Sequence, residues 1–357
     1  MARAVHLAAR ANHSTSPNPM VGAVVVQGDE VVGEGLHRRA GGPHAEVAAL
    51  RAAGGKARGA TLYVTLEPCS HHGRTGPCVD AVTRAGISRV VIAQRDPSPG
   101  VGGAGVRRLR AAGIEVSVGD GRAAARGLNP AWLRAQQAGR PFVALKYAAT
   151  LDGKTASRTG DSQWITGGAA RLETHRLRSA YSAVMVGAQT VLLDDPRLNA
   201  RDGTGAPSGR QPLRVVVDGR LRTDPRARVH AVAGGGSLVM ASRRASVARL
   251  AGFRAAGVDV EVVDADEPSG SQLLAALRRR GVSSVLAEGG GELAWSLAGE
   301  GLVDHVYAFT GPILLGGRTA PTPVGGEGYE RLVGGLRLEI VSVRRLGPDL
   351  LVEAVAA

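Results

Sequence analysis

The chain has 357 residues, a formal net charge of +13 and only two cysteines. At about 150 residues per domain this length predicts two domains, and two cysteines are too few for the disulfide framework of a secreted scaffold. Because every apolar run is far shorter than the roughly 18 residues that a membrane helix needs, we exclude a membrane protein and expect a cytoplasmic one.

Arginine supplies nearly all of the positive charge, since Lys56, Lys146 and Lys154 are the only lysines. Nucleic-acid-binding surfaces also need aromatic side chains that stack on bases, and aromatic residues make up only 3% of the chain. Most arginines are therefore expected on the solvated surface, and a small anionic ligand suits the remainder better than a nucleic acid does.

Residues 1–118 alternate between helix and strand patterns. Residues 3–12 predict a helix, and the runs 21–26 and 30–35 predict a β-hairpin with Gly28 at its turn. Further helices are predicted at 44–53, 79–85 and 106–112, and strands at 60–65, 89–93 and 115–118. Gly102, Gly103 and Gly105 are interpreted as a turn that leads into the helix at 106–112. These elements predict a compact α/β domain.

The alanine- and arginine-rich segment 123–140 predicts one more helix, and Gly139-Arg140-Pro141 ends it. We therefore expect two domains, 1–140 and 141–357. In the second, strands are predicted at 142–148, 183–186, 213–217, 237–240, 258–262 and 284–287, and helices at 169–179, 245–255, 271–279 and from 292. This alternation predicts a mostly parallel sheet covered on both faces, and 336–343 with 350–354 predicts a closing antiparallel hairpin.

Three potential metal ligands and one acid stand out in the first half: His44 with Glu46, Cys69 and Cys78. One imidazole and two thiolates suit a catalytic zinc that keeps its fourth position for water. Glu46 follows His44 by two residues at a helix start, so its carboxylate can transfer protons at that water without being a ligand. This H-x-E and P-C arrangement is typical of zinc deaminases that act on nucleobases.

Two alternatives remain open for this cluster. Eight residues separate Cys69 from Cys78, where the general deaminase pattern has two. His71 or His72 could be a fourth ligand and close a structural zinc site, but such a site gives Glu46 no role, and these histidines fit better in a loop over the substrate. The two cysteines could also be ordinary buried thiols, although both follow a proline near the same His-x-Glu.

The string Glu67-Pro68-Cys69-Ser70-His71-His72-Gly73-Arg74-Thr75-Gly76-Pro77-Cys78, with His44-Ala45-Glu46, resembles the bifunctional pyrimidine deaminase–reductases of riboflavin biosynthesis. The resemblance accounts for the wide cysteine spacing and runs from about His6 to the C-terminus. It implies an α/β fold with an N-terminal cytidine-deaminase-like three-layer domain and a C-terminal dihydrofolate-reductase-like domain. Asn18, in Asn18-Pro19-Met20-Val21-Gly22, resembles the loop residue that contacts the base.

Dinucleotide binding in the second half has a weaker signal of its own. A G-x-G-x-x-G fingerprint after the first strand is absent, but Ala287-Glu288-Gly289-Gly290-Gly291 ends a strand and opens a helix. Free N–H groups and the dipole at such a helix start bind pyrophosphate, and glycines let its backbone approach closely. Glu288, at the carboxyl end of the strand, would face the cleft and bind polar groups of the substrate.

The resemblance implies the remaining contacts of a reductase that uses NADPH. Substrate contacts are implied at Ser162, in Ser162-Gln163-Trp164-Ile165-Thr166, and at Arg178, Leu198 and Arg201. Cofactor contacts are implied at Ala148, Trp164, Thr190, Asp194, Gly219, Gly290, Gly291, Glu292, Leu293, Ala294, Trp295 and Ser296. Gly219 is a departure, because the family often has serine there, so contact to the ribose phosphate would pass to the backbone, Arg220 or Arg222.

The expected function has two steps. The resemblance implies that the first half uses Zn²⁺ to remove the 2-amino group of 2,5-diamino-6-(5-phosphoribosylamino)pyrimidin-4-one. The second half would then use NADPH to give 5-amino-6-(5-phosphoribitylamino)uracil. The expected partners are this small phosphorylated pyrimidine and further copies of the chain, in a dimer or tetramer.

Two other functions are weighed against this one. A nucleic-acid-editing zinc deaminase with an appended binding domain would explain the charge and the zinc ligands. It leaves the Asp194-Asp195-Pro196 string and the glycine-rich turn unexplained. A second alternative keeps the fold but makes one half purely structural or dimerising, although the motif positions of both halves are largely intact.

Overall fold

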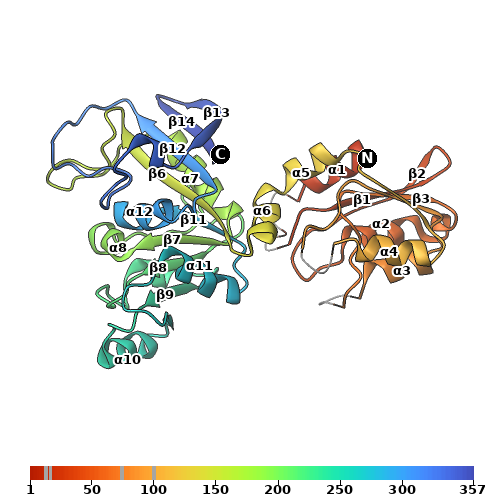
Figure 1. Cartoon of the computed structure of the whole chain (residues 1–357), viewed down its shortest axis with the longest axis horizontal. Helices are drawn as coiled ribbons and strands as arrows, with labels where there is room; N and C mark the ends of the chain where they lie inside the picture. Colours follow the sequence, from red (N-terminus) through yellow and green to blue (C-terminus); the bar gives the residue numbers. More distant parts are fainter. Residues whose placement is uncertain (12–14, 16–17, 73–75, 99–101) are drawn as a thin grey trace. The chain divides into compact units, whose positions relative to one another are not determined.

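The computed structural model describes residues 1–11, 15, 18–72, 76–98 and 102–357. Gly73, Arg74 and Thr75 of the cysteine-bearing string lie outside the described residues, as does the last position of the predicted first helix. The chain divides into two compact units, Met1–Gly139 and Arg140–Ala357 (Figure 1). Each unit has its own sheet and its own hydrophobic core, and each is described by itself.

The N-terminal unit is built on a five-stranded sheet of order β2-β1-β3-β4-β5. β1 pairs antiparallel with β2 and β3, and β4 and β5 continue the sheet in parallel. The strands are β1 (Gly22–Gln27), β2 (Glu30–Leu36), β3 (Thr61–Val64), β4 (Arg89–Ile92) and β5 (Glu115–Val118). The helices up to β5 are α1 (Ala2–Ala9), α2 (Ala45–Ala53), the 3-10 turn η1 (Gly54–Ala57), α3 (Cys78–Arg84) and α4 (Ala104–Ala111). The elements predicted for this part of the chain are confirmed, with shifts at their ends.

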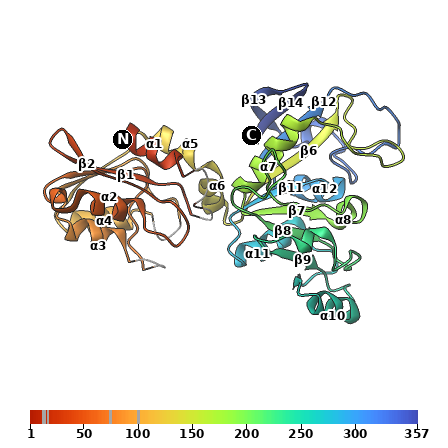
Figure 2. The same cartoon turned by 180° about the vertical axis from the view of Figure 1, so that it is seen from behind.

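The side chains of β1 point alternately to the two faces of the sheet, and helices pack on both faces, so this unit has three layers. Ala23 and Val25 belong to a core that α2, α3 and α4 cover, whereas Val24 on the opposite face packs with Leu7 of α1. Figures 1 and 2 show α2, α3 and α4 on one side of this sheet and α1 on the other. The main chain of α2 lies close to β2, because a Cβ on Gly35 would be only 2.2 Å from the carbonyl oxygen of Ala45. The start of α2 is thereby fixed on the sheet.

The single helix predicted over 123–140 is wrong, because two helices occupy this segment: α5 (Arg122–Leu128) and α6 (Pro130–Ala138). Pro130 has no N–H to donate and disfavours helical backbone at the preceding residue, so Asn129 leaves the helical region with a φ of −129°. The Asn129 amide then accepts a hydrogen bond from Met20 N at 2.7 Å and donates one to Met20 O at 2.9 Å. The break therefore anchors the loop that carries Asn18.

The C-terminal unit is built on a nine-stranded sheet of order β10-β9-β8-β7-β11-β6-β12-β14-β13. Neighbouring strands are parallel except where β14 pairs with β12 and β13. The strands are β6 (Phe142–Thr150), β7 (Ala183–Gly187), β8 (Leu213–Val217), β9 (Ser237–Ala241), β10 (Asp259–Val262), β11 (Ser284–Glu288), β12 (His305–Gly311), β13 (Leu338–Leu346) and β14 (Asp349–Ala356). The helices are α7 (Gly168–Ala180), α8 (Ala188–Asp194), α9 (Arg228–Ala231), α10 (Val247–Ala255), α11 (Gly270–Arg279), α12 (Gly291–Gly299) and the 3-10 turn η2 (Leu332–Gly334).

Helices cover both faces of the central strands. α11 and α12 pack on one face, in a core that includes Val143 and Val285. On the other face Phe309 and Leu351 pack against Ala170 of α7. The expectation of two covered faces does not hold for the edge strand β13, most of whose residues are exposed.

Sequence reasoning missed β12, α8 and α9. β12 lies between β6 and β14, and its buried positions do not alternate strictly, so the period-two signal of a strand is weak there. α8 and α9 have seven and four residues, which is too short for a helical period to show clearly. Their positions depend on the sheet around them.

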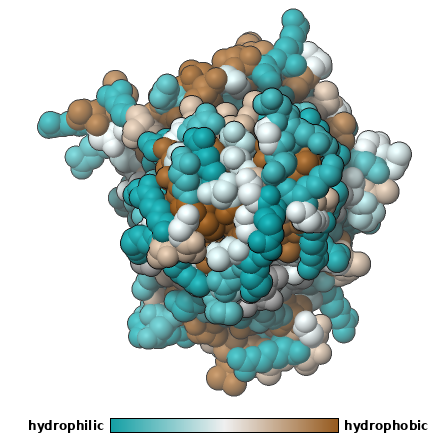
Figure 3. Space-filling view, turned by 90° about the vertical axis from the view of Figure 1, so that its right-hand side faces the viewer, coloured by the Kyte–Doolittle hydropathy of each residue, from teal (hydrophilic) through white to brown (hydrophobic). Residues whose placement is uncertain are grey.

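The described part of the chain contains no helix that is long and apolar enough to cross a membrane. The face turned to the viewer in Figure 3 presents mainly hydrophilic side chains, with hydrophobic ones in recesses between them.

Candidate functional site

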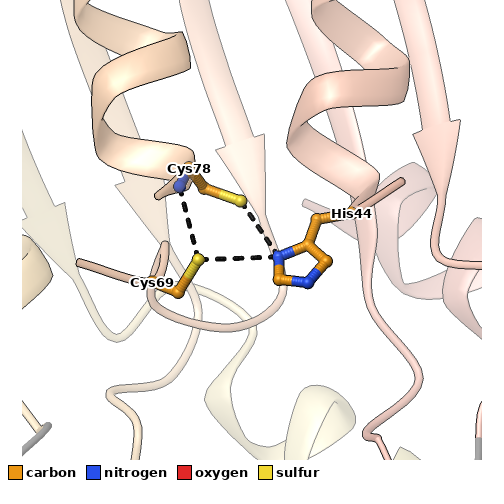
Figure 4. A group of neighbouring side chains, drawn as sticks. All are labelled: His44, Cys69 and Cys78. Carbon is orange, nitrogen blue, oxygen red and sulfur yellow. Dashed lines mark hydrogen bonds between the residues drawn. The ribbon is translucent and has the colours of Figure 1, made fainter. Parts of the chain in front are cut away.

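Three ligand atoms meet between the starts of two helices in the N-terminal unit (Figure 4). His44 is the N-cap residue of α2, Cys78 is the first residue of α3, and Cys69 lies in the segment after β3. His44 Nδ1 is 3.1 Å from Cys78 Sγ and 3.5 Å from Cys69 Sγ, and the Cys78 N–H donates to Cys69 Sγ at 3.3 Å. All three ligand atoms lie within 4.8 Å of one another. The structure thus brings together the three residues that the sequence predicts as metal ligands.

The chemistry of this donor set fits a zinc ion. The hydrogen bond from Cys78 lowers the pKa of Cys69, so the Cys69 thiol loses its proton more readily, and the same contact raises the pKa of Cys78. The hydrogen bond with Cys69 also raises the pKa of His44. Two thiols and an imidazole that contact one another in this way can bind zinc once they have lost their protons.

Glu46 lies in the first turn of α2, where its side chain is buried. Burial raises the pKa of Glu46 to about 7, so at neutral pH the carboxyl group can both accept and release a proton. Glu46 is not one of the three clustered ligand atoms. This is the arrangement that a proton-transferring acid beside a metal needs.

The two other histidines of the string are placed apart from the cluster. His71 and His72 are exposed, and the group of potential ligands found among the described residues comprises His44, Cys69 and Cys78 alone. The structure therefore does not support a closed structural zinc site with His71 or His72 as a fourth ligand.

Asn18 is oriented by a histidine that sequence reasoning missed. His37 is 3% exposed, and its Nδ1 is 2.9 Å from the carbonyl oxygen of Pro43. A carbonyl only accepts, so Nδ1 carries the proton and Nε2 is free to accept from Asn18 Nδ2, 3.1 Å away. The oxygen of the Asn18 amide is thereby turned away from His37. No spacing rule in the sequence marked His37.

A buried ion pair joins the end of β11 to α7 in the C-terminal unit. Arg178 of α7 donates to both carboxylate oxygens of Glu288, at 2.7 and 2.9 Å, and Lys146 Nζ is 3.9 Å from the same carboxylate. Burial alone would raise the pKa of Glu288, but the two cations outweigh it and the pKa is lowered. Glu288 is 6% exposed, and Arg178 donates to both of its oxygens; its contact with polar groups of the substrate stays a prediction. Lys146 was not predicted.

The segment that follows α8 completes this cluster. The Asn199 carbonyl accepts hydrogen bonds from Arg178 at 3.1 Å and from His175 at 3.1 Å, which ties α7 to the turn that holds Leu198, at a φ of +54°. Burial, followed by the charges of Arg178 and other nearby arginines, lowers the pKa of Arg201. Arg201 Nε is buried and has no partner among the described residues. A buried guanidinium N–H without a partner suits an anionic ligand.

The predicted cofactor positions gather after the strands of this sheet. Ser162 Oγ is 3.5 Å from an oxygen of Asp194, and Thr190 Oγ1 would be 3.4 Å from a Cβ on Gly290. Trp164 is 67% exposed, and Arg171 lies over its ring at 4.5 Å. Ala148 is on β6, and Gly219 follows β8, where a Cβ would be 3.2 Å from Ser242 Oγ.

The start of α12 is the predicted phosphate-binding turn. Gly289 and Gly290 have φ values of +73° and +86°, which glycine adopts at little cost. Leu293 and Ala294 have buried side chains, and the ring of Trp295 packs against Tyr329. A bound cofactor would therefore meet main-chain N–H groups of this turn rather than those side chains. The turn is also covered, because Gly325 N donates to Gly291 O at 3.0 Å and Gly326 N to Glu292 Oε1 at 3.2 Å.

Both units match known domain families. Residues 1–94 match the cytidine and deoxycytidylate deaminase zinc-binding region, and residues 141–352 match the RibD C-terminal domain. The second match assigns the C-terminal half to a reductase domain of riboflavin biosynthesis rather than to an appended nucleic-acid-binding domain.

Whole proteins match over nearly their full length. Riboflavin biosynthesis protein RibD of Actinobacillus pleuropneumoniae is 41% identical over 357 residues, with 99% of this chain and 94% of that protein covered. RibD of Escherichia coli K12 is 40% identical over 380 residues, with 100% and 98% covered. The structure of Acinetobacter baumannii RibD is 38% identical with a TM-score of 0.88, covering 100% of this chain and 97% of that chain. With both domains matched in order, the chain belongs to the RibD family, which joins a zinc-dependent deaminase to a reductase in riboflavin biosynthesis.

Proposed function

We propose that the N-terminal unit hydrolyses the 2-amino group of 2,5-diamino-6-(5-phosphoribosylamino)pyrimidin-4-one. The C-terminal unit then reduces the ribose of the product with NADPH, giving 5-amino-6-(5-phosphoribitylamino)uracil. The observation that carries this proposal is the cluster of His44, Cys69 and Cys78 beside buried Glu46, in a chain matched by RibD relatives along its length. A Thermotoga maritima structure named for these two activities, 37% identical with a TM-score of 0.82 and covering 100% of this chain and 97% of that chain, supports the choice of substrate.

In the deaminase, His44, Cys69 and Cys78 are the proposed zinc ligands and Glu46 is the catalytic acid and base. When bound, zinc would supply Lewis-acid activation of the water that attacks the amine-bearing ring carbon. Glu46 takes the two protons of this nucleophile in turn, delivering the first to the ring nitrogen and the second to the amine, which leaves as ammonia. Its place in the first turn of α2, two residues after the ligand His44, supports both transfers. Asn18 binds the base through the amide oxygen that its contact with His37 leaves free.

In the reductase, the substrate contacts are proposed at Ser162, Arg178, Leu198, Arg201 and Glu288. The unpartnered Nε of Arg201 supports a contact with the substrate phosphate. Arg178 and Glu288 fix each other in one geometry, so both side chains are already in place to orient the ribose when the substrate binds. When bound, NADPH supplies the hydride for C1′, and the protein supplies position and charge.

The NADPH site is proposed on the turns after β6, β7, β8 and β11. The residues assigned to it are Ala148, Trp164, Thr190, Asp194, Gly219, Gly290, Gly291, Glu292, Leu293, Ala294, Trp295 and Ser296. The positive φ angles of Gly289 and Gly290 and the helix that follows support phosphate binding there. We assign the deaminase activity to residues 1–140 and the reductase activity to residues 141–357.

We further propose a homo-oligomer, a dimer or tetramer, in the cytoplasm, with no nucleic-acid partner. The edge strand β13 supports self-association, because Ile340 and Val343 are 64% and 60% exposed on it, and an exposed apolar edge strand favours pairing with another copy. Size-exclusion chromatography with light scattering measures the state. A Val343→Lys variant should be smaller in mass than the unaltered protein.

Two variants of the full chain test the two activities separately. Glu46→Gln should abolish ammonia release from the diaminopyrimidine but still oxidise NADPH with the pre-deaminated substrate. Glu288→Gln should release ammonia at the normal rate but reduce slowly. Zinc analysis of each preparation checks that both retain the metal. Loss of both activities in Glu46→Gln would contradict two independent sites, and absence of zinc from the unaltered protein would contradict the deaminase assignment.

A further inference from the structure

The segment that carries Cys69 depends on neighbouring elements for its geometry. It connects the end of β3 at Val64 to the start of α3 at Cys78, and none of its described residues belongs to a helix or strand. It is hydrogen-bonded to α4, an element that contributes no ligand to the cluster. Two side chains make these contacts: Glu67 on the segment itself and Arg108 on α4.

Glu67 joins the segment to the beginning of α4. Its side chain is 5% exposed, and its carboxylate accepts hydrogen bonds from Gly103 N at 2.9 Å, Val106 N at 3.0 Å and Asp96 N at 3.2 Å. Gly103 is the N-cap residue of α4, and Val106 lies in its first turn. A carboxylate placed on the free N–H groups of a helix start is stabilised by hydrogen bonds and by the helix dipole. The acid therefore caps α4 from a residue that lies two positions before Cys69.

The two main chains also approach very closely at this point. A Cβ on Gly105 would be 2.2 Å from the carbonyl oxygen of Pro68, so only glycine lets the first turn of α4 lie against the residue before Cys69. The contact leaves the Cys69 main chain little freedom to move toward or away from α4.

Arg108 makes a second attachment one turn further along α4. Its guanidinium donates to the carbonyl oxygen of Ser70 at 2.6 Å and to an oxygen of Asp80 at 2.7 Å. Ser70 follows Cys69 directly, and Asp80 lies two positions after Cys78 in the first turn of α3. One planar side chain thus connects the segments of both cysteines, as the fixed fork of an arginine can.

We propose that α4 positions the two thiolates of the zinc site, with Glu67 and Arg108 as its positioning residues. This inference rests on the proposed zinc deaminase activity. Glu67 fixes the chain before Cys69, and Arg108 fixes the chain after Cys69 relative to the chain after Cys78. A tetrahedral zinc site tolerates little change in the placement of its ligands. Partners that hold ligands in this way change metal affinity or activity by about 10–100-fold when they are removed.

The test compares Arg108→Ala, Arg108→Lys and Glu67→Gln in the full chain, with Arg107→Ala as the matched control. Arg107 is an exposed arginine on the same helix. The measurements are zinc release to a chromophoric chelator, the visible absorption of the Co²⁺-substituted protein, and kcat and KM for ammonia release. Circular dichroism and thermal unfolding of each preparation report whether the N-terminal unit is folded, and reductase activity reports the state of the C-terminal unit. Arg108 is half exposed, so its replacement tests the proposal even if Glu67→Gln folds poorly.

Zinc release should be about 10–100-fold faster in Arg108→Ala and in Glu67→Gln, with shifted Co²⁺ bands, lower kcat for ammonia release and normal reductase activity. Arg108→Lys should recover part of the loss, and Arg107→Ala should behave as the unaltered protein. Release rates and Co²⁺ bands that stay unchanged in Arg108→Ala would overturn the proposal, as would an equal loss in Arg107→Ala. Failure of the unaltered protein to bind zinc would instead refute the proposed deaminase, and the inference with it.

Discussion

The buried pair of Arg178 and Glu288 allows structure and function to be separated by a double-mutant cycle. The pair is bidentate, at 2.7 and 2.9 Å, and both side chains are largely buried. We consider Arg178→Met, Glu288→Leu and the double variant. Each single change leaves one charge buried without its partner, whereas the double change replaces the pair by apolar side chains.

The structure sets the size of the effect. Breaking a buried ion pair from one side costs about 3–5 kcal/mol, whereas replacing both members by apolar residues is often close to neutral. In Arg178→Met, the Glu288 carboxylate still has Lys146 at 3.9 Å. The loss of unfolding free energy should therefore lie at the lower end of this range, at about 3 kcal/mol. Glu288→Leu leaves Arg178 and Lys146 facing each other and should cost more. For a domain of roughly 200 residues, 3 kcal/mol lowers Tm by about 6–12 °C.

The assay is thermal and urea unfolding of the full chain, with NADPH oxidation on the pre-deaminated substrate. The double variant should regain most of the stability that each single variant loses, which gives a coupling energy of about 6 kcal/mol, but it should remain inactive as a reductase. If the double variant lost the sum of the two single losses, the pair would not be coupled and the argument would fail. If it regained activity, neither residue would contact substrate.

Three further predictions follow from single contacts. His37→Ala removes the group that orients Asn18, so KM for ammonia release should rise by about 2–10-fold, as expected for the loss of one hydrogen bond. NADPH oxidation should stay unchanged, and an unchanged KM would contradict the role of His37 in orienting Asn18. Arg214 is 1% exposed and donates to the carbonyl oxygens of Val229, Gly234 and Val232 at 2.7–2.8 Å, so Arg214→Met should cost at least about 2 kcal/mol in urea unfolding; a cost below about 0.5 kcal/mol would contradict this. Burial, and then the charge of Arg178, lowers the pKa of His175 to about 4. Between pH 6.5 and 4 the unfolded chain therefore binds more protons at this residue than the folded chain does. The free energy of unfolding should fall on acidification, by less than about 1 kcal/mol per pH unit because His175 is partly exposed. His175→Gln should flatten this dependence on pH.

The chemistry of the deaminase site could be read from the sequence because it depends on residue types. Only a few side chains bind zinc, and His44, Cys69 and Cys78 are the ones that a three-ligand site needs. Glu46 was found because it lies two residues from a ligand, within one helix turn. The strands other than β12 were predicted for a similar reason, since apolar runs between turns mark buried strands wherever they pair.

Contacts between distant segments had no such signal. His37 acts on Asn18 across the β-hairpin, Glu67 caps a helix that begins 37 residues later at Ala104, and Glu288 meets Arg178 across 110 positions. Each of these side chains is an ordinary polar residue in its local sequence, and only the packing of strands and helices gives it a partner. The same holds for β12, which is a strand because β6 and β14 lie on either side of it.

The sequence by itself therefore determined the composition of the sites, and the tertiary structure decided how their members are held. Two cysteines in a chain of 357 residues first served only to exclude a disulfide scaffold, and their proline-flanked positions then marked a metal site. Distances through space decide which elements hold the two thiolates. They also decide which of the many arginines pairs with a buried acid. Those distances follow from the order of strands in the sheet, which no local pattern of residues encodes.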